Sequence, residues 1–128
     1  MSEEAAIRKM YDRYLESVNT GNLDSWVSFN TADCVWLAPG HAPVQGPAAI
    51  STYGQETWFG VYEMDHAILL KEIVETGDSD ARAWGTWTID VKPKDGSAAQ
   101  SMRGNFLDVL RKESDGWKFS RVCFNITE

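Results

Sequence analysis

Four polar side chains that lie in apolar stretches are the residues of this chain best suited to chemistry. Tyr14 falls in a helical apolar stripe, His41 in a proline-bounded loop, His66 on a predicted strand and Asn105 on a later one. A phenol O–H can stabilise a developing oxyanion, and a histidine exchanges protons near neutral pH. Tyr14 as hydrogen-bond donor, His41 as acid or base and Asn105 as the group that orients a substrate oxygen are therefore the candidate catalytic residues.

Each of these side chains also has a structural alternative. Tyr14 could be a core tyrosine bonded to a backbone carbonyl, and His41 could be a solvent-facing loop residue. Asn105 could simply bond a neighbouring group. We interpret His66 as structural, because it alternates with apolar residues along its strand.

Several other kinds of site are excluded. The chain has no glycine-rich phosphate loop after a strand and no Gly-x-Ser-x-Gly elbow. Its two histidines fall on different elements and do not have metal-ligand spacing. We therefore expect no cofactor and no metal.

Length and charge narrow the function further. The 128 residues predict one domain, residues 1–128, and a formal net charge of −7 without a basic stripe argues against nucleic acid and anionic membrane as partners. The N-terminus lacks an apolar signal core, so a cytoplasmic location is expected. Cys34 and Cys123 lie in apolar strand-like stretches, which predicts two buried thiols.

Hydrophobic periodicity predicts an α+β domain. Helical spacing covers two N-terminal segments, separated by Asn19 to Asn22, where Asn22 can cap the second helix. A third helix begins at Pro47, which suits a first helical position. Strand patterns joined by short polar turns, typical of antiparallel hairpins, cover 34–38, 64–76, 81–91, 101–111 and 117–126.

The segment 34–47 organises this order of elements. It is an apolar strand followed by a turn at Pro39-Gly40 and by a loop that carries His41, Pro43 and Gln45 and ends at Gly46-Pro47. Two glycines and several prolines fix the backbone of this short connection. Such a loop is expected to close a core or to rim a pocket.

Four motifs together carry a family resemblance. They are Arg13-Tyr14-Leu15 with Asn19-Thr-Gly-Asn-Leu-Asp24, Val35-Trp-Leu-Ala-Pro-Gly40, Gln45-Gly-Pro-Ala-Ala-Ile50, and Asp108-Val-Leu-Arg111 with Asp115-Gly-Trp-Lys118. With these four motifs in this order, the chain resembles the SnoaL-like and ketosteroid isomerase-like families of the nuclear transport factor 2-like superfamily. The resemblance implies a cone-shaped, cystatin-like roll, in which three N-terminal helices pack on a strongly curved, mainly antiparallel sheet around an apolar cavity. It also implies a homodimer packed through the sheet.

The resemblance implies a cavity wall as well. Its members would be Trp36 and Ala38 from the first strand, Trp84, Thr86 and Thr88 from the third, Val122 and Phe124 from the last, and Tyr14, Trp26, Tyr53 and Trp58 from the helices. Such a pocket is expected to bind a small, flat, mostly apolar molecule that bears one or two oxygens.

The reaction is less well defined by the resemblance. Ketosteroid isomerase uses an aspartate base with an oxyanion hole made of a tyrosine and a protonated aspartic acid. Tyr14 matches that tyrosine, but Ala38 stands at the position of the base. No acid falls between Asn105 and Leu107, where the second acid is expected, although Asn105 could donate a hydrogen bond in its place.

Other activities of these families match no better. Arg103 and Arg121 lack the two inward aspartates of an epoxide hydrolase-like site. The tyrosines and histidines at 14, 53, 41 and 66 match scytalone dehydratase only loosely, and Ala38 does not favour a SnoaL-like cyclase.

Two functional hypotheses follow from these residues. The first is a small-molecule-binding cone domain, catalytic or not, that acts as an isomerase, cyclase or hydratase by proton transfer. The second is a non-catalytic homodimerisation or association module whose pocket is filled by its own tryptophans.

Overall fold

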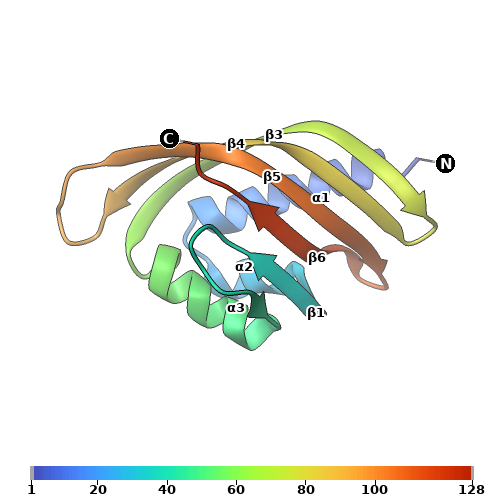
Figure 1. Cartoon of the computed structure of the whole chain (residues 1–128), viewed down its shortest axis with the longest axis horizontal. Helices are drawn as coiled ribbons and strands as arrows, with labels where there is room; N and C mark the ends of the chain where they lie inside the picture. The colour runs from blue at the N-terminus through green and yellow to red at the C-terminus, as the bar shows by residue number, and fades with distance from the viewer. Residues whose placement is uncertain (1, 128) are drawn as a thin grey trace.

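A curved sheet covers three helices in the computed structural model, which describes residues 2–127. The elements run α1 (Glu4–Asn19), α2 (Leu23–Ser28), β1 (Asn30–Leu37), β2 (Val44–Gln45), α3 (Pro47–Gly54), a π-helical turn η1 (Gln55–Phe59), β3 (Tyr62–Gly77), β4 (Asp80–Pro93), β5 (Gln100–Glu113) and β6 (Gly116–Phe124). The sheet arches over the helices (Figure 1). The predicted α+β cone is therefore confirmed.

The helices begin where local chemistry favours a helix start. Asn22 caps α2, because its side-chain oxygen accepts a hydrogen bond from the Ser25 backbone N–H at 3.1 Å. Gly46 has a positive φ of 84°, which a glycine adopts without strain, and Pro47 occupies the first turn of α3. The loop that precedes α3 thus has the stiff backbone that its glycines and prolines predict.

The sheet is mixed rather than wholly antiparallel. Its strand order is β2-β1-β6-β5-β4-β3; β1 pairs in parallel with β6, and the other neighbours are antiparallel. The sequence patterns did not predict the two-residue strand β2. At the other edge, β3 changes its pairing register between Leu70 and Glu72, so the inward residues are even-numbered before this bulge and include Ile73 after it.

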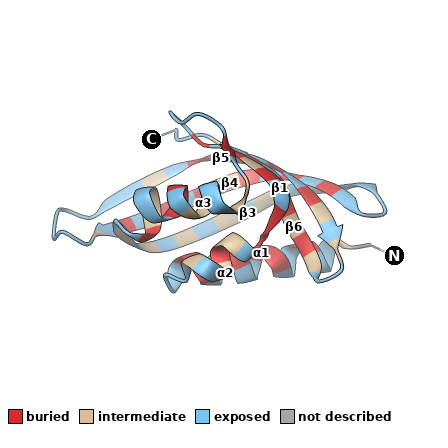
Figure 2. Cartoon of the chain, turned by 90° about the horizontal axis from the view of Figure 1, so that it is seen from below, coloured by how far each residue is buried: buried red, intermediate tan, exposed pale blue. Residues whose placement is uncertain are grey.

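Residues alternate between a buried face, which packs on the helices, and an exposed outer face (Figure 2). Along β4 the buried residues are Ala81, Ala83, Trp87, Ile89 and Val91. Along β5 the buried face carries Phe106, Asp108 and Leu110. The core is therefore one aromatic-rich layer between the sheet and α1.

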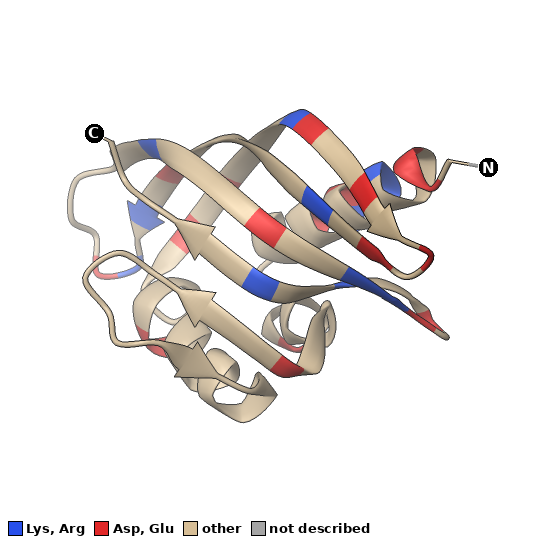
Figure 3. Cartoon of the chain, turned by 45° about the vertical axis from the view of Figure 1, so that its right-hand side comes forward, with Lys and Arg blue, Asp and Glu red and all other residues tan. Residues whose placement is uncertain are grey.

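Charged residues are spread over the strands, the turns and α1 (Figure 3), and nearly all of them are exposed or half-buried. Both cysteines are free thiols. Cys34 is buried as predicted, but Cys123 is exposed, because its side chain points to the outer face of β6. None of the helices within residues 2–127 combines the length and the apolar character that a membrane crossing requires.

Candidate active site

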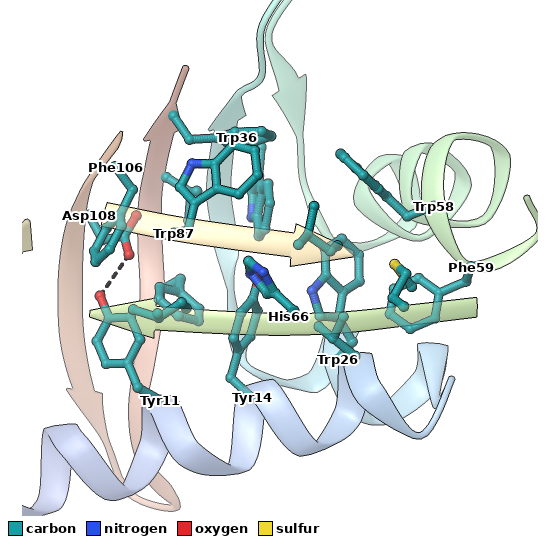
Figure 4. Close-up of a pocket in the computed structure, with 17 residues that line it drawn as sticks. Tyr11, Tyr14, Trp26, Trp36, Trp58, Phe59, His66, Trp87, Phe106 and Asp108 are labelled. Atoms are coloured by element: carbon teal, nitrogen blue, oxygen red, sulfur yellow. Dashed lines mark hydrogen bonds between the residues drawn. The ribbon is translucent and has the colours of Figure 1, made fainter. Parts of the chain in front are cut away.

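An apolar cavity of about 80 Å³ lies between α1 and the concave face of the sheet. This volume is several times the roughly 10–15 Å³ that a cavity needs to hold one water molecule. Tyr11 and Asp108 lie at one end, Trp58 and Phe59 at the other, and His66 between them (Figure 4). The four tryptophans of the wall narrow the cone without filling it; they are Trp26, Trp36, Trp58 and Trp87.

Asp108 is the buried acid of this cavity. Its side chain comes from the buried face of β5, and the residue is 4% exposed. The Tyr11 hydroxyl, from α1, donates a hydrogen bond of 2.6 Å to its Oδ2, and its Oδ1 is buried without a hydrogen-bond partner among residues 2–127. An unpaired buried polar atom costs about 1–3 kcal/mol, so Oδ1 is a candidate position for a ligand atom.

Burial determines the protonation state of this acid. Desolvation raises the pKa of Asp108 to about 8, although the hydrogen bond from Tyr11 opposes the shift. The carboxyl is therefore mostly protonated at neutral pH. Because Oδ2 accepts the Tyr11 hydrogen, the proton of the neutral carboxyl lies on the buried Oδ1. Tyr11 itself stays un-ionised, since burial and the nearby Asp108 raise its pKa well above the usual value.

His66 provides the complementary group. Its Nδ1 lies 2.9 Å from the backbone carbonyl oxygen of Thr88, which can only accept, so Nδ1 carries the ring hydrogen. Desolvation lowers the pKa of His66 below its usual 6.5, which keeps the ring neutral at neutral pH. The lone pair of Nε2 is then the free basic position on a ring that lines the cavity.

Aromatic rings surround these groups. Tyr14 packs edge-on against Phe119, with ring centroids 5.0 Å apart, and its centroid is 6.5 Å from that of His66. Burial raises the pKa of Tyr14, so its phenol is also neutral. The indole N–H groups of three wall tryptophans bond within the protein: Trp36 to Asn30, Trp58 to Tyr53 and Trp87 to the Asn105 carbonyl. The wall therefore offers mainly ring faces to a ligand.

Six predicted wall residues do line the cavity. They are Tyr14, Trp26, Trp36, Trp58, Val122 and Phe124. Two others, Ala38 and Tyr53, are buried but do not line it. Tyr53 instead accepts the 3.0 Å hydrogen bond from the Trp58 indole and so supports the wall from behind.

Five predicted positions lie elsewhere. Trp84, Thr86 and Thr88 were expected to face the cavity, but β4 presents its odd-numbered apolar residues inward, and Trp84 is 44% exposed on the outer face. Asn105 also points outward, because on β5 the even-numbered residues face inward. His41 is exposed in the loop after β1, where its ring packs against that of Tyr53, with centroids 5.1 Å apart.

Sequence reasoning missed three of the polar groups in the cavity. His66 was interpreted as structural, Tyr11 was not among the candidates, and Asp108 was recognised only as part of a family motif. The alternation Phe106, Asp108, Leu110 was a usable signal, because it places the acid among large apolar residues every second position. It was ambiguous because the opposite face of this strand, with Leu107 and Val109, is also apolar.

No group of three or more metal-ligating side chains converges anywhere within residues 2–127. The polar groups of the cavity are instead a neutral acid, a neutral base and two phenols. This donor set suits proton transfer more than metal binding.

Comparison with known proteins identifies a family and a fold. A family model described as a SnoaL-like domain matches residues 1–122. No curated protein matches this sequence closely enough to count as a relative.

Several solved structures share the fold. A ketosteroid isomerase-like protein from Erwinia carotovora atroseptica SCRI1043 is 23% identical, with a TM-score of 0.88, over 99% of this chain and 98% of that one. A conserved protein from Planctomyces limnophilus DSM 3776 is 24% identical, with a TM-score of 0.84, over 97% of each chain. A hexachlorocyclohexane dehydrochlorinase, LinA-type3, from Novosphingobium barchaimii LL02 is 16% identical, with a TM-score of 0.81, over 98% and 87%. At these identities the likeness supports the fold alone.

Proposed function

Since the chain belongs to the SnoaL-like domain family, we propose that its cavity binds a small, uncharged, mostly apolar molecule and catalyses proton transfer on it. One observation carries the proposal: a neutral acid with an unpaired oxygen and a neutral base with a free lone pair line the same apolar cavity. Asp108 is the acid and His66 the base. Structural neighbours named for an isomerase and a dehydrochlorinase are compatible with this activity.

The wall favours an uncharged ligand. No Lys or Arg is present among the described residues that line the cavity. A carboxylate or phosphate would therefore be buried without a counter-charge, which is costly in an apolar site. A ketone or enone instead presents one acceptor oxygen to Asp108 and a flat apolar body to the aromatic wall.

The proton transfer can be written so that it balances. His66 Nε2 removes a proton from the carbon next to a carbonyl group, and the C–H electron pair forms a carbon–carbon double bond. The carbonyl oxygen gains the hydrogen bond, or the proton, of Asp108, so that an enol or hydrogen-bonded enolate forms. Return of the proton to a different carbon completes an isomerisation. Tyr14, next to the His66 ring, is proposed as a second neutral donor within the cavity.

Proton exchange in D₂O tests the proposal without knowledge of the natural substrate. Acetophenone and cyclohexanone should lose their α-proton NMR signals faster with the protein than without it. His66→Gln should slow this exchange by about 100-fold or more, because general-base catalysis contributes at least that much. Asp108→Leu should slow it similarly, whereas Asp108→Asn, which keeps an N–H donor, should retain more activity.

The pH dependence provides an independent check. Exchange needs neutral His66 and protonated Asp108, so the rate should rise through the lowered His66 pKa, below 6.5, and fall at about pH 8. Exchange rates that are the same for the wild type, His66→Gln and Asp108→Leu at every pH would refute the proposal.

A second observation favours a homodimer packed through the sheet. Four exposed residues with little polarity lie in register across four strands of the outer face: Trp84, Leu107, Cys123 and Leu37. Leu69 and Val109 are further exposed apolar residues of the outer face, and they lie outside this row, opposite Thr86 and Arg82 respectively. Contiguous exposed apolar surface of this kind marks interaction sites.

Charges on the same face suit a second copy of the chain as the partner. Asp65 on β3 lies opposite Asp90 on β4, near one edge of the sheet. Arg121 lies on β6, nearer the other edge. A two-fold arrangement can bring the acidic Asp65 and Asp90 of one copy near the basic Arg121 of the other. We propose this homodimer together with the catalytic cavity, since the two surfaces occupy opposite faces of the sheet.

A further inference from the structure

We infer that Asn19 is a positioning residue that holds His66 in the geometry in which Nε2 stays free to accept a proton. The inference rests on the proposed role of His66 as the base. It concerns a residue outside the cavity, at the end of α1, whose side-chain amide binds only the backbone of β3.

The position of His66 in the sheet explains why its backbone needs a hydrogen-bond partner outside the sheet. β3 is an edge strand that pairs only with β4. His66 lies opposite Ile89 in that pairing, and its backbone N–H and carbonyl bond Asn19 on the side away from β4. Without Asn19 these two groups would face water on a free strand edge, where local opening costs least.

The Asn19 side chain takes the place of the missing neighbouring strand. The His66 N–H donates to Asn19 Oδ1 at 2.7 Å, and Asn19 Nδ2 donates to the His66 carbonyl oxygen at 3.1 Å. Both partners have fixed polarity, so the orientation of the amide is determined. Of the side chains with this length, only an asparagine offers one acceptor and one donor in this spacing.

On its other side, His66 is held by β4. The ring Nδ1–H donates to the Thr88 carbonyl oxygen at 2.9 Å. Three hydrogen bonds therefore hold one residue, two at its backbone and one at its ring. The backbone pair keeps the Cα in register, and the ring bond selects the tautomer whose Nε2 is unprotonated.

The chain contains only two histidines, which makes the test clean. Long-range ¹H–¹⁵N NMR reports the tautomer of each ring, and exposed His41 serves as the internal reference. In the wild type, His66 should show a single Nδ1–H tautomer. Asn19→Ala should convert it to a tautomer mixture and speed amide exchange at His66 about tenfold, as expected for the loss of hydrogen bonds at a strand edge.

Two further variants distinguish positioning from general loosening. Asn19→Asp keeps the acceptor for the His66 N–H but sets a carboxylate oxygen against the His66 carbonyl oxygen, so it should perturb the His66 signals although one of the two backbone hydrogen bonds remains. Thr20→Ala is the matched control, because the Thr20 hydroxyl bonds only the Glu16 carbonyl within the same helix end, at 2.7 Å. It should leave the His66 signals unchanged.

The inference is overturned if Asn19→Ala leaves the tautomer and amide exchange of His66 as in the wild type. It is also overturned if Thr20→Ala changes them as much as Asn19→Ala does. These measurements need no substrate. A lack of ketone exchange would therefore remove the proposed function while leaving this result intact.

Discussion

The protonation of Asp108 should leave a measurable trace in stability. Its pKa is about 8 in the folded protein, against an ordinary value of 3.8. Between these values the folded state keeps a proton that the unfolded state has released. Stability must then fall as the pH rises, and the fall should stop above about pH 8, where both states are ionised.

The size of the effect follows from one proton. A full proton of difference changes the free energy of unfolding by about 1.4 kcal/mol per pH unit. From pH 5 to pH 7 the contribution of Asp108 should therefore decrease by about 3 kcal/mol. For a domain of this size that corresponds to roughly 10 °C in Tm.

Asp108→Asn isolates this contribution, because it removes the titration and keeps the shape. Urea unfolding of the wild type and the variant at pH 5 and pH 7 gives two stability differences. Subtracting one difference from the other cancels every other titrating group. The variant should gain about 3 kcal/mol relative to the wild type between the two pH values. An equal difference at both would mean that the carboxyl is already ionised at pH 5, and the acid assigned to the cavity would be lost.

Three further predictions concern the surroundings of the site. Tyr11→Phe removes the hydrogen bond to Asp108 Oδ2, so it should raise the pKa of Asp108 further and destabilise the fold by about 1–3 kcal/mol. Carboxyl ¹³C NMR measures the change in pKa, and urea unfolding measures the change in stability. Gly54→Ala would place a Cβ 2.6 Å from Cζ3 of Trp26, so the ring must move and the fold should lose about 1–3 kcal/mol; an unshifted Trp26 indole signal and unchanged stability would contradict this. If the proposed homodimer forms, the wild type should sediment as a dimer in analytical ultracentrifugation, and Leu107→Lys should yield monomers at the same concentration, because it adds a charge to a residue that is 51% exposed in the outer-face row.

The architecture was largely predictable from local patterns. Caps, prolines and helical spacing identified the three helices, and polar turns separated the four long strands. The strand β2 was not predictable, because two residues carry no periodicity. The parallel pairing of β1 with β6 is set by tertiary packing, which no local pattern reports.

The cavity was predicted better in shape than in chemistry. Trp36, Val122 and Phe124 line the cavity as the resemblance implied, whereas the face of β4 was assigned the wrong way round. Both faces of that strand carry a tryptophan, so alternation alone could not select the inner one. A slip of one residue exchanges the two faces completely.

Asp108 was missed for the same reason, because the sequence did not show whether the odd-numbered or the even-numbered residues of β5 face inward. The resemblance suggested positions 105 to 107, but the inward carboxyl is at Asp108, whose partner Tyr11 lies one helical turn before Tyr14. Only the three-dimensional pairing of a helix residue with a strand residue identifies these two as a unit. Likewise, the free nitrogen of His66 depends on a carbonyl in the next strand, which a single sequence does not locate.

The hydrogen bond between Tyr11 and Asp108 joins residues 97 positions apart in the chain. At a translation rate of about 5–20 residues per second, roughly 5–20 s separate the synthesis of the phenol from that of its acid. During that interval α1 has an apolar face, and the strands β5 and β6 that complete the sheet over it are still missing. The pairing of Tyr11 with Asp108 therefore forms only after most of the chain has been made, and a nascent chain that stops before β5 lacks the buried acid of the cavity.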